Sequence, residues 1–585
     1  MVRVSVKVTG AQGQGINSVG EMCAKGLKRA GYCVFGYREY MSLIKGGHSS
    51  YQLDVSPDKI ESTETKVNVL VCFNHHGLEK NLGEVKDSGL VLHQSPEWKF
   101  SQELEKDLAK RKIIAVCLPV DRILKELKAP PVLGNVLITA VVWAMLRRDA
   151  DELKELVREQ FGHKGEKILN LNFQAIDAAE AWVAKENLTK RWSSPLPKPG
   201  SSWKDYLLLT GSHAMGLGLV HAGCRVYAGY PMTPSSPLLG YIGDIQNETG
   251  MVMKQAEDEI TAAQMMSGAM MMGTRAITAT SGGGFDLMSE TVSLNAIIEN
   301  PSVFVLAQRP GPGTGLPTWT AQGDLLLAIG AAHGEFARLV VSVSDAQDSF
   351  DLMPEAFNYA EEFQTPVIVL TDKQIAEAIY TQKPYDLKKA KLRRGELVED
   401  PKELKDLEAS DRYEPHTPDG ISSRWLPGSS GPAFVSQGDE HSDDGTVDES
   451  SENASAQMEK RMRKMEALKN ALPEPDYFGP DGKLDLLLVS WGSNKSVILD
   501  ALRDPAFKGK KIGYMHYTYL WPMKTEKLEK LMKSAKKVAL IECNYQGQLG
   551  MMLRMAGGPG IEEKILKYDG RPFFYDELIT RIKAL

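Results

Sequence analysis

Apolar and polar residues follow one another along the chain in two periods, one that suits strands and one that suits helices. In the first third, short apolar or alternating runs at residues 3–9, 67–73, 89–93 and 112–118 predict strands, with amphipathic stretches between them. The same pattern predicts strands at 225–228, 275–280, 302–307, 337–343 and 366–370, and again at 486–491, 511–517 and 537–542. Strands that alternate with helices indicate parallel sheets covered by helices. We therefore expect an α/β fold with several doubly wound, mostly parallel-sheet domains.

Two stretches interrupt this pattern. Residues 187–200 contain three prolines among polar residues, which disfavour regular structure and predict a linker at 184–203. Residues 377–483 are charged and carry an acidic run at 439–452, so they cannot bury a core of their own. We expect this segment to be an extended arm with one helix at 457–471. The chain then divides into 1–183, 204–376 and 484–585 around the linker and the arm.

Composition excludes several classes of protein. Of 585 residues, 42% are hydrophobic and 25% charged, and the formal net charge of -7 argues against a nucleic-acid partner. The N-terminus lacks the apolar run of a secretory signal, and no apolar stretch reaches the length of about 18 residues that a membrane helix needs. We expect a cytoplasmic protein that does not bind membranes.

The six cysteines bear on metal chemistry. They show no Cys-x-x-Cys spacing, whereas iron–sulfur clusters and structural zinc sites usually use clustered thiolates. The chain is therefore expected to hold no metal by itself. Buried free thiols are the ordinary interpretation.

A hydroxyl loop follows the predicted strand at 225–228. Residues 230–236 read Tyr-Pro-Met-Thr-Pro-Ser-Ser, and the two prolines stiffen the loop. Thr233 lies between them, where it could donate a hydrogen bond to a carboxylate. The alternative is that Thr233 or Ser235 merely caps the next helix.

An acidic cluster, Glu257, Asp258 and Glu259, lies in an apolar, methionine-rich segment at 251–273 that is expected to be one helix. Acids near a helix start complement its dipole, which explains Asp258. Glu259 has apolar neighbours that disfavour its charged form, and this suits a carboxyl that exchanges protons. Thiamine chemistry needs such a carboxyl at N1′ of the aminopyrimidine ring.

A third candidate is Arg309, which follows the predicted strand at 302–307 in a run rich in proline and glycine. Its guanidinium matches a carboxylate in bidentate fashion. The alternative is a solvated surface loop. Gly282, Gly283 and Gly284 could similarly allow close approach of a flat ring, or form a turn without a ligand.

A glycine-rich turn lies after the first strand, where Gly10, Gly13 and Gly15 open the next helix. Backbone amides at such a position can hold phosphate. The spacing differs from the dinucleotide fingerprint. Lys45 could add a cation nearby, and His48 is as readily a packed histidine as a functional one.

Taken in order, these motifs resemble those of the fused gamma-alpha subunit of 2-oxoacid:ferredoxin oxidoreductases. The glycine turn with Lys45 resembles the gamma domain, and residues 230–236 are similar to the alpha signature Tyr-Pro-Ile-Thr-Pro-Ser-Ser, with Met232 in place of Ile. Matching segments follow at 257–260, 280–284, 309–312, 439–441 and 542–548. One departure is Gly-Ser-His-Ala at 211–214, where relatives tend to have Gly-Asn-Glu-Ala, so His213 receives no role.

The resemblance implies a domain order. It consists of a gamma domain at 1–183, a linker at 184–203 and a thiamine-pyrimidine-binding domain at 204–376. The arm at 377–483 and a transketolase C-terminal-like domain at 484–585 follow.

The resemblance also implies a reaction and a set of residues. A 2-oxoacid, coenzyme A and oxidised ferredoxin yield an acyl-CoA, carbon dioxide and reduced ferredoxin, with thiamine diphosphate as cofactor. Glu259 would be the catalytic contact to thiamine, and Thr233 and Arg309 would bind the substrate carboxylate. Tyr230, Pro231, Ser281 and Gly283 would contact the cofactor, and Gly13, Gly15 and Lys45 would contact coenzyme A.

The cofactor is expected to be shared with a second chain. The sequence contains no Gly-Asp-Gly motif, which thiamine enzymes use to hold Mg²⁺ and diphosphate. The resemblance places that motif, Mg²⁺ and a [4Fe-4S] cluster on a beta subunit, in an αβ or (αβ)2 assembly that reduces ferredoxin. This chain alone should be inactive. We favour 2-oxoglutarate as substrate; pyruvate, branched-chain 2-oxoacids and a non-catalytic metabolite-binding scaffold remain open.

Overall fold

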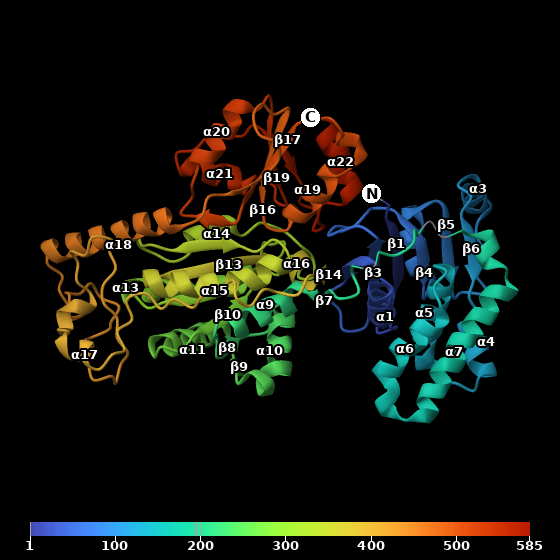
Figure 1. Cartoon of the computed structure of the whole chain (residues 1–585), viewed down its shortest axis with the longest axis horizontal. Coiled ribbons are helices and arrows are strands. Elements are labelled where there is room, and N and C mark those ends of the chain that lie inside the picture. The colour runs from blue at the N-terminus through green and yellow to red at the C-terminus, as the bar shows by residue number, and fades with distance from the viewer. Residues whose placement is uncertain (1, 194–195, 201) are drawn as a thin grey trace.

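The structure is a computed structural model that describes residues 2–193, 196–200 and 202–585. Within these ranges the strands form three sheets, of eight, seven and five strands. We call residues 2–193 the first unit, 204–376 the middle unit, 377–483 the arm and 484–585 the last unit. Figure 1 shows the first unit at the right, the last unit at the top and the arm at the left end of the middle unit.

The first sheet combines parallel and antiparallel strands. It is parallel across β6-β5-β4-β1 and antiparallel across β1-β3-β2-β14-β7. The expected strands at 3–9, 67–73, 89–93 and 112–118 are observed. The strands are β1 (Val4–Gln12), β2 (Cys33–Tyr40), β3 (Gly46–Ser56), β4 (Val67–Cys72), β5 (Val85–His93), β6 (Ile114–Cys117), β7 (Leu207–Thr210) and β14 (Ile379–Gln382).

Strand β3 was not predicted because polar side chains interrupt its apolar pattern. Gln52 and Asp54 are nevertheless 2% and 0% exposed. Asp54 accepts hydrogen bonds from Ser5 Oγ at 2.5 Å and from Thr63 Oγ1 at 2.6 Å. Buried polar groups of this kind require partners, which only the folded sheet supplies.

Helices cover both faces of the first sheet. They are α1 (Ile16–Arg29), α2 (His75–Asn81), α3 (Gln102–Lys110), α4 (Val120–Glu126), α5 (Gly134–Met145), α6 (Ala150–Phe161), α7 (Glu166–Lys185) and α8 (Leu188–Arg191). Helix α8 lies in the segment expected to be an irregular linker, and that expectation was wrong there. Leu188 and Trp192 are buried in the hydrophobic core of the first unit. The free energy gained by burying these side chains offsets the local preference for a loop. Linker residues 194, 195 and 201 lie outside the described ranges.

The middle sheet is parallel except for one edge strand from the last unit. Its order is β18-β12-β13-β11-β10-β8-β9. Its strands are β8 (Val226–Gly229), β9 (Val252–Gln255), β10 (Ala276–Thr280), β11 (Ser302–Gln308), β12 (Leu339–Ser342), β13 (Pro366–Asp372) and β18 (Tyr519–Trp521). The helices are α9 (Gly211–His221), α10 (Ser236–Thr249), α11 (Glu259–Met271), α12 (Gly282–Leu287), α13 (Ser289–Ile297), α14 (Leu325–Gly330), α15 (Ala346–Phe363) and α16 (Lys373–Glu377).

The segment at 251–273 is not a single helix. Its first residues form the edge strand β9, which pairs with β8, and α11 begins only at Glu259. Asp258 stops the extended backbone and caps the helix, because its side chain accepts a hydrogen bond from Thr261 N at 2.7 Å. Glu259 therefore stands at the first position of α11.

The third sheet has the order β15-β17-β16-β19-β20 and is parallel apart from β15. The strands are β15 (Asp476–Phe478), β16 (Leu486–Trp491), β17 (Ile512–Tyr517), β19 (Val538–Glu542) and β20 (Glu563–Leu566). The helices are α19 (Asn494–Leu502), α20 (Glu526–Ser534), α21 (Gln548–Met555) and α22 (Tyr575–Lys583). The strands predicted at 486–491, 511–517 and 537–542 are observed as β16, β17 and β19, whereas β18 and β20 were not predicted.

The arm is held on the middle unit by buried charges. Its helices are α17 (Glu403–Asp406) and α18 (Ser451–Ala471), the latter longer than the expected 457–471. Lys460 and Lys464 of α18 reach Glu299 at 2.7 and 3.1 Å. Burial opposes the charge of Glu299, but Lys460, Lys464 and Arg412 outweigh it and lower the pKa of this carboxyl to about 2.

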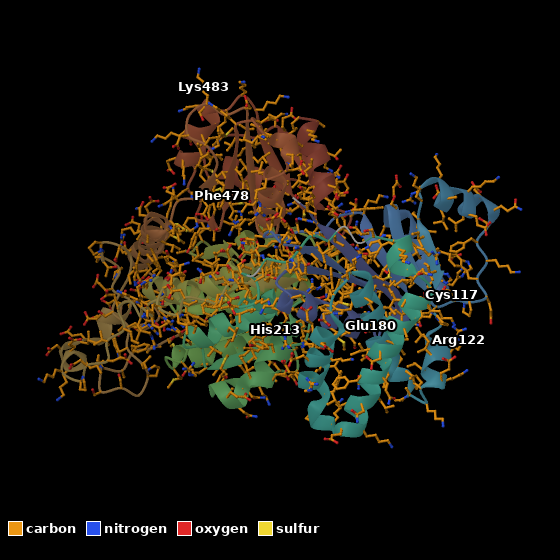
Figure 2. All side chains as sticks on the ribbon, turned by 45° about the vertical axis from the view of Figure 1, so that its right-hand side comes forward. Cys117, Arg122, Glu180, His213, Phe478 and Lys483 are labelled. Atoms are coloured by element: carbon orange, nitrogen blue, oxygen red, sulfur yellow. The ribbon has the colours of Figure 1, made fainter. Side chains whose placement is uncertain are left out.

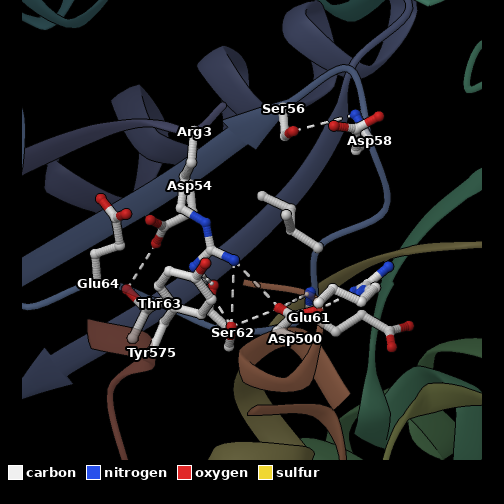
Figure 3. A network of polar contacts seen from close by, with 12 residues as sticks. Arg3, Asp54, Ser56, Asp58, Glu61, Ser62, Thr63, Glu64, Asp500 and Tyr575 are labelled. Atoms are coloured by element: carbon white, nitrogen blue, oxygen red, sulfur yellow. Dashed lines mark hydrogen bonds and ion pairs between the residues drawn. The ribbon is translucent and has the colours of Figure 1, made fainter. Parts of the chain in front are cut away.

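The first and last units also contact each other directly. In Figure 3, Arg3, which directly precedes β1, and Ser62 both point to Asp500 of α19. Arg3 Nη2 lies 3.2 Å and Ser62 Oγ 2.5 Å from Asp500 Oδ2, and the Glu61 amide donates to the same oxygen at 2.9 Å.

The free cysteines are packed inside the molecule. Five of the six are buried and Cys117 is half-buried, as expected for packed thiols.

Across the described ranges, every helix is too short or too polar to cross a bilayer.

Candidate functional site

The residues singled out between positions 230 and 309 meet at one edge of the middle sheet, whereas Gly13, Gly15 and Lys45 lie in the first unit. Thr233 follows β8, Ser281 follows β10 and Arg309 follows β11, and these three strands are parallel neighbours. Their carboxyl ends therefore lie at the same edge, where ligands bind in open α/β sheets. Glu259 joins them from the start of α11, because that helix packs against β8 and β10.

Glu259 is a buried carboxyl, 4% exposed, and its Oε1 has no hydrogen-bond partner. The carboxyl lies against the glycine run of α12. A Cβ at Gly284 would stand 2.7 Å from Glu259 Oε1, closer than atoms can approach. Only glycine fits this position without displacing the carboxyl.

Arg309 is fixed by the loop that contains Thr233. Its Nη1 donates a hydrogen bond to Thr233 O at 2.7 Å, so the contact uses the threonine carbonyl and not its hydroxyl. Burial lowers the pKa of Arg309, and the neighbouring Asp324 carboxyl opposes this shift. The loop is also held from β10, since Thr280 Oγ1 lies 3.7 Å from Met232 Sδ.

The other residues of this loop are not used as helix caps. Ser235 precedes α10, but its hydroxyl donates to Met232 O at 2.6 Å and makes no cap bond. The capping alternative is therefore wrong for Ser235. Tyr230 is half-buried and Pro231 is exposed.

The glycine run combines a buried hydroxyl with open space. Ser281 is 0% exposed and its Oγ has no hydrogen-bond partner. Gly283 is exposed, and a Cβ there would meet nothing within 4 Å. A flat ring can therefore approach the backbone at Gly283 from the solvent side, whereas Gly284 is closed by Glu259.

Residues 309–324 connect β11 to α14, and we call this segment the Arg309 loop. It belongs to the middle unit and contacts both the first unit and the last unit. Thr318 Oγ1 donates to Tyr40 O of the first unit at 2.5 Å. Thr320 N donates to Gly570 O of the last unit at 3.0 Å, and the Arg571 guanidinium stacks 3.8 Å above the Trp319 ring. The loop is thus anchored on both sides.

A groove of about 520 Å³ lies beside the glycine turn of the first unit. Gly13 and Gly15 line it, both with positive φ, together with Arg38 and Tyr40. Lys45 is exposed on the adjacent loop and does not line the groove. Because Tyr40 also contacts Thr318, the groove and the Arg309 loop are neighbours.

Sequence reasoning missed Asp324. It stands beside Arg309 and Gly282, and its Oδ2 is buried without a hydrogen-bond partner. An isolated aspartate before an apolar helix suggests a cap, so the sequence offered no signal of another role.

His213, which received no role, stabilises the start of α9. Thr210 Oγ1 accepts a hydrogen bond from His213 N at 3.2 Å, and the imidazole ring packs 4.5 Å from Tyr241. Burial lowers the pKa of this histidine. Figure 2 labels His213 in the middle unit, apart from Cys117 and Glu180 of the first unit.

The donor set fits the pyrimidine half of thiamine diphosphate. Two unpartnered buried polar atoms, Glu259 Oε1 and Ser281 Oγ, flank a glycine run that leaves space for a ring. A buried carboxyl can hold a proton at a ring nitrogen, and a guanidinium beside it can bind a carboxylate.

Comparisons with known proteins show the family to which this chain belongs. Residues 217–467 match the family described as pyruvate flavodoxin/ferredoxin oxidoreductase, thiamine diphosphate-binding, and residues 5–182 match pyruvate ferredoxin/flavodoxin oxidoreductase. The 2-oxoacid:ferredoxin oxidoreductase subunit alpha of Sulfolobus sp is 32% identical over 631 residues, which cover 99% of this chain and 96% of that protein.

Two further relatives carry 2-oxoglutarate in their names. The 2-oxoglutarate synthase subunit KorA of Methanothermobacter marburgensis is 29% identical over 379 residues, covering 64% of this chain and 98% of that protein. The solved structure of 2-oxoglutarate:ferredoxin oxidoreductase from Magnetococcus marinus, with 2-oxoglutarate, coenzyme A and succinyl-CoA bound, has a TM-score of 0.91 and 29% identity. It covers 100% of this chain and 99% of that chain.

Proposed function

This chain belongs to the alpha subunits of the 2-oxoacid:ferredoxin oxidoreductases, and we propose that its substrate is 2-oxoglutarate. The enzyme converts a 2-oxoacid and coenzyme A to an acyl-CoA and carbon dioxide and passes electrons to ferredoxin. Two relatives whose names contain 2-oxoglutarate support this substrate, one of them a solved structure with 2-oxoglutarate bound. The acyl product would then be succinyl-CoA.

In this proposal Glu259 holds a proton at N1′ of the thiamine pyrimidine. Its burial and its unpartnered Oε1 support the role, because a ring nitrogen would supply the missing partner. Ser281, Gly283, Tyr230 and Pro231 complete the pyrimidine site. When bound, thiamine diphosphate would supply the carbon nucleophile and would accept the electron pair left by carbon dioxide.

Arg309 binds the carboxylate that will be lost, with Thr233 beside it. The hydrogen bond from Arg309 to the Thr233 carbonyl fixes the direction of the guanidinium before substrate arrives. The anchored loop keeps this geometry, and removal of water from the site strengthens the ion pair.

Coenzyme A binds in the groove of the first unit. Gly13 and Gly15 expose backbone amides to it, and Arg38 offers a cation for phosphate. Lys45 lies outside the lining and meets at most the outer part of the ligand. The contact between Tyr40 and Thr318 supports delivery of the thiol toward Arg309.

The remaining parts of the cofactor belong to a beta subunit. The absence of Gly-Asp-Gly from this sequence supports binding of Mg²⁺ and diphosphate by that partner, and the absence of Cys-x-x-Cys supports a [4Fe-4S] cluster there. We assign residues 1–183 to the coenzyme A side, 204–376 to the pyrimidine and 484–585 to the transketolase C-terminal-like part. The assembly would be αβ or (αβ)2.

The observation that carries this proposal is the meeting of Glu259, Arg309 and the glycine run at neighbouring strand ends. The test is turnover of the assembled complex on a panel of 2-oxoacids with coenzyme A and ferredoxin. We expect the highest kcat/KM with 2-oxoglutarate. A higher kcat/KM with pyruvate or a branched-chain 2-oxoacid would overturn the substrate assignment but not the family.

A further inference from the structure

Asp324 lies in the same site as Arg309, but none of its interactions explains why a carboxyl stands at this position. Its backbone amide donates to Gln308 Oε1 at 3.1 Å, and Gln308 directly precedes Arg309. Its carboxyl lies over the glycine run, where Asp324 Oδ2 would stand 3.0 Å from a Cβ at Gly282. The structure therefore places this carboxyl against the run expected to hold the cofactor, within electrostatic range of the Arg309 guanidinium.

Asp324 is not a helix cap, although it precedes α14. Its side chain makes no hydrogen bond to the first turn of that helix. By contrast, Asp258, Asp345 and Asp372 each cap a helix in the middle unit through a side-chain bond of 2.7 to 3.0 Å. The carboxyl of Asp324 is thus left to the site, with a buried and unpartnered Oδ2.

Two charged groups act on this carboxyl among the described residues. Asp286 of α12 repels it and Arg309 attracts it. Its own helix α14 is apolar, and α21, which packs on α14, contributes the neutral Gln548. Burial first, and Asp286 second, raise the pKa of Asp324 to about 6, with Arg309 opposing both.

A substrate carboxylate on Arg309 would bring a second anion close to Asp324, which is already within electrostatic range of that guanidinium. Two carboxylates near one cation in a buried site repel each other, and a proton on one of them removes the repulsion. We propose that Asp324 is a positioning residue that takes up one proton from water as the 2-oxoacid carboxylate binds to Arg309. The protonated carboxyl then donates a hydrogen bond within the site, and the proton returns to water when the carboxylate leaves as carbon dioxide.

The sign of the pH effect follows from this linkage. With the pKa of Asp324 at about 6 in the empty site, its carboxylate is mostly ionised at neutral pH. Binding then requires protonation, which becomes harder as pH rises. KM for the 2-oxoacid should increase up to about tenfold per pH unit above pH 6.

The experiment uses the assembled complex with 2-oxoglutarate, measured from pH 5.5 to 8.5. The wild type should show the rise in KM for 2-oxoglutarate while KM for coenzyme A stays level. Asp324→Asn, whose amide is a permanent neutral donor, should keep a low KM at high pH and give a flat profile. A merely structural role would change KM without removing its pH dependence, and that result would overturn the proposal.

Asp286→Asn is the matched variant, because it removes one charge that acts on Asp324 from an exposed position. In this variant KM for 2-oxoglutarate should still rise with pH, but the rise should begin at lower pH, because the repulsion that raises the pKa of Asp324 is gone. An unshifted profile would contradict the proposal even if Asp324→Asn failed to fold.

The inference rests on the proposed role of Arg309, and Arg309→Ala separates the two. If that variant leaves KM for 2-oxoglutarate unchanged, the carboxylate clamp itself is wrong. If it raises KM while Asp324→Asn behaves as wild type across the pH range, only the role of Asp324 fails.

Discussion

At the scale of single residues, burial gives similar side chains different tasks. Asp258 and Glu259 are adjacent acids, yet Asp258 caps α11 while Glu259 keeps an unpartnered oxygen. Leaving a buried polar atom without a partner costs about 1–3 kcal/mol, so such an atom calls for a partner from outside the chain, either water or a ligand. Glu259 is therefore the residue whose replacement tests the site most directly.

We expect Glu259→Gln to lower turnover of the assembled complex by about 10²- to 10⁴-fold, because proton transfer by a positioned side chain contributes that much. The fold should persist, since glutamine has the same shape. Glu257→Gln, at an exposed position two residues earlier, is the control and should turn over normally. Near-normal turnover of Glu259→Gln would favour a non-catalytic scaffold.

Arg309→Ala should raise KM for the 2-oxoacid by about 10- to 150-fold, the loss of one charge-assisted hydrogen bond worth about 1.5–3 kcal/mol. KM for coenzyme A should change little, because Arg309 does not line the groove of the first unit. Steady-state kinetics with each substrate varied in turn measures the difference. Equal changes in both KM values would count against a direct contact with the carboxylate.

At the scale of elements, the arm is held by a buried charge cluster and only a few apolar side chains. Leu468 and Leu472 enter the core of the middle unit, while Glu299 pairs with two lysines of α18. The lowered pKa of Glu299 means that its contribution to stability is complete above its usual value of 4.5. It is lost as pH falls through about 2.

Glu299→Gln should destabilise the docked arm by about 3–5 kcal/mol at neutral pH, because it leaves two buried lysine charges uncompensated. Limited proteolysis should cut α18 faster in this variant. In the wild type, protection from cleavage should fall between pH 4.5 and 2, and the variant should not show this pH dependence. Glu459→Gln, exposed on the same helix, is the control. Equal cleavage rates for the two variants would show that the ion cluster does not hold the arm.

At the scale of the whole molecule, the first unit is connected to the rest by more than its linker. Strand β14 pairs with β2, and Thr381 Oγ1 exchanges hydrogen bonds of 2.8 and 2.9 Å with the Val34 backbone. The buried ion pair between Arg3 and Asp500 also joins the first unit to the last unit. The substrate site and the groove thereby keep a fixed relation.

Cutting the chain between residues 193 and 202 should leave the two fragments associated, because these contacts remain. Asp500→Ala should weaken the association by about 3–5 kcal/mol, since it removes one member of the buried Arg3–Asp500 pair and the oxygen to which Ser62 and the Glu61 amide donate. Size-exclusion chromatography of the cut protein at falling concentration measures this, with exposed Asp481→Ala as control. Separation of the wild-type fragments at micromolar concentration would contradict the prediction.

The sequence by itself determined what is local. Apolar runs of strand length identified the buried parallel strands of all three sheets, because such strands are covered on both faces and need little information from elsewhere. The mostly exposed edge strands β9 and β20 were not predicted. It also identified the ordered motifs that carry Thr233, Glu259 and Arg309, because the chemistry of each residue type is evident without coordinates.

Only the tertiary structure decided what depends on distant partners. Strand β3 carries buried polar residues, and β7 and β14 join a sheet from which they are far apart in sequence, so no local pattern predicts them. Asp324 resembles a helix cap until Gly282 and Arg309 are placed beside it. Burial, repulsion and attraction act through space, and the site therefore becomes complete only when strand ends from separate segments meet.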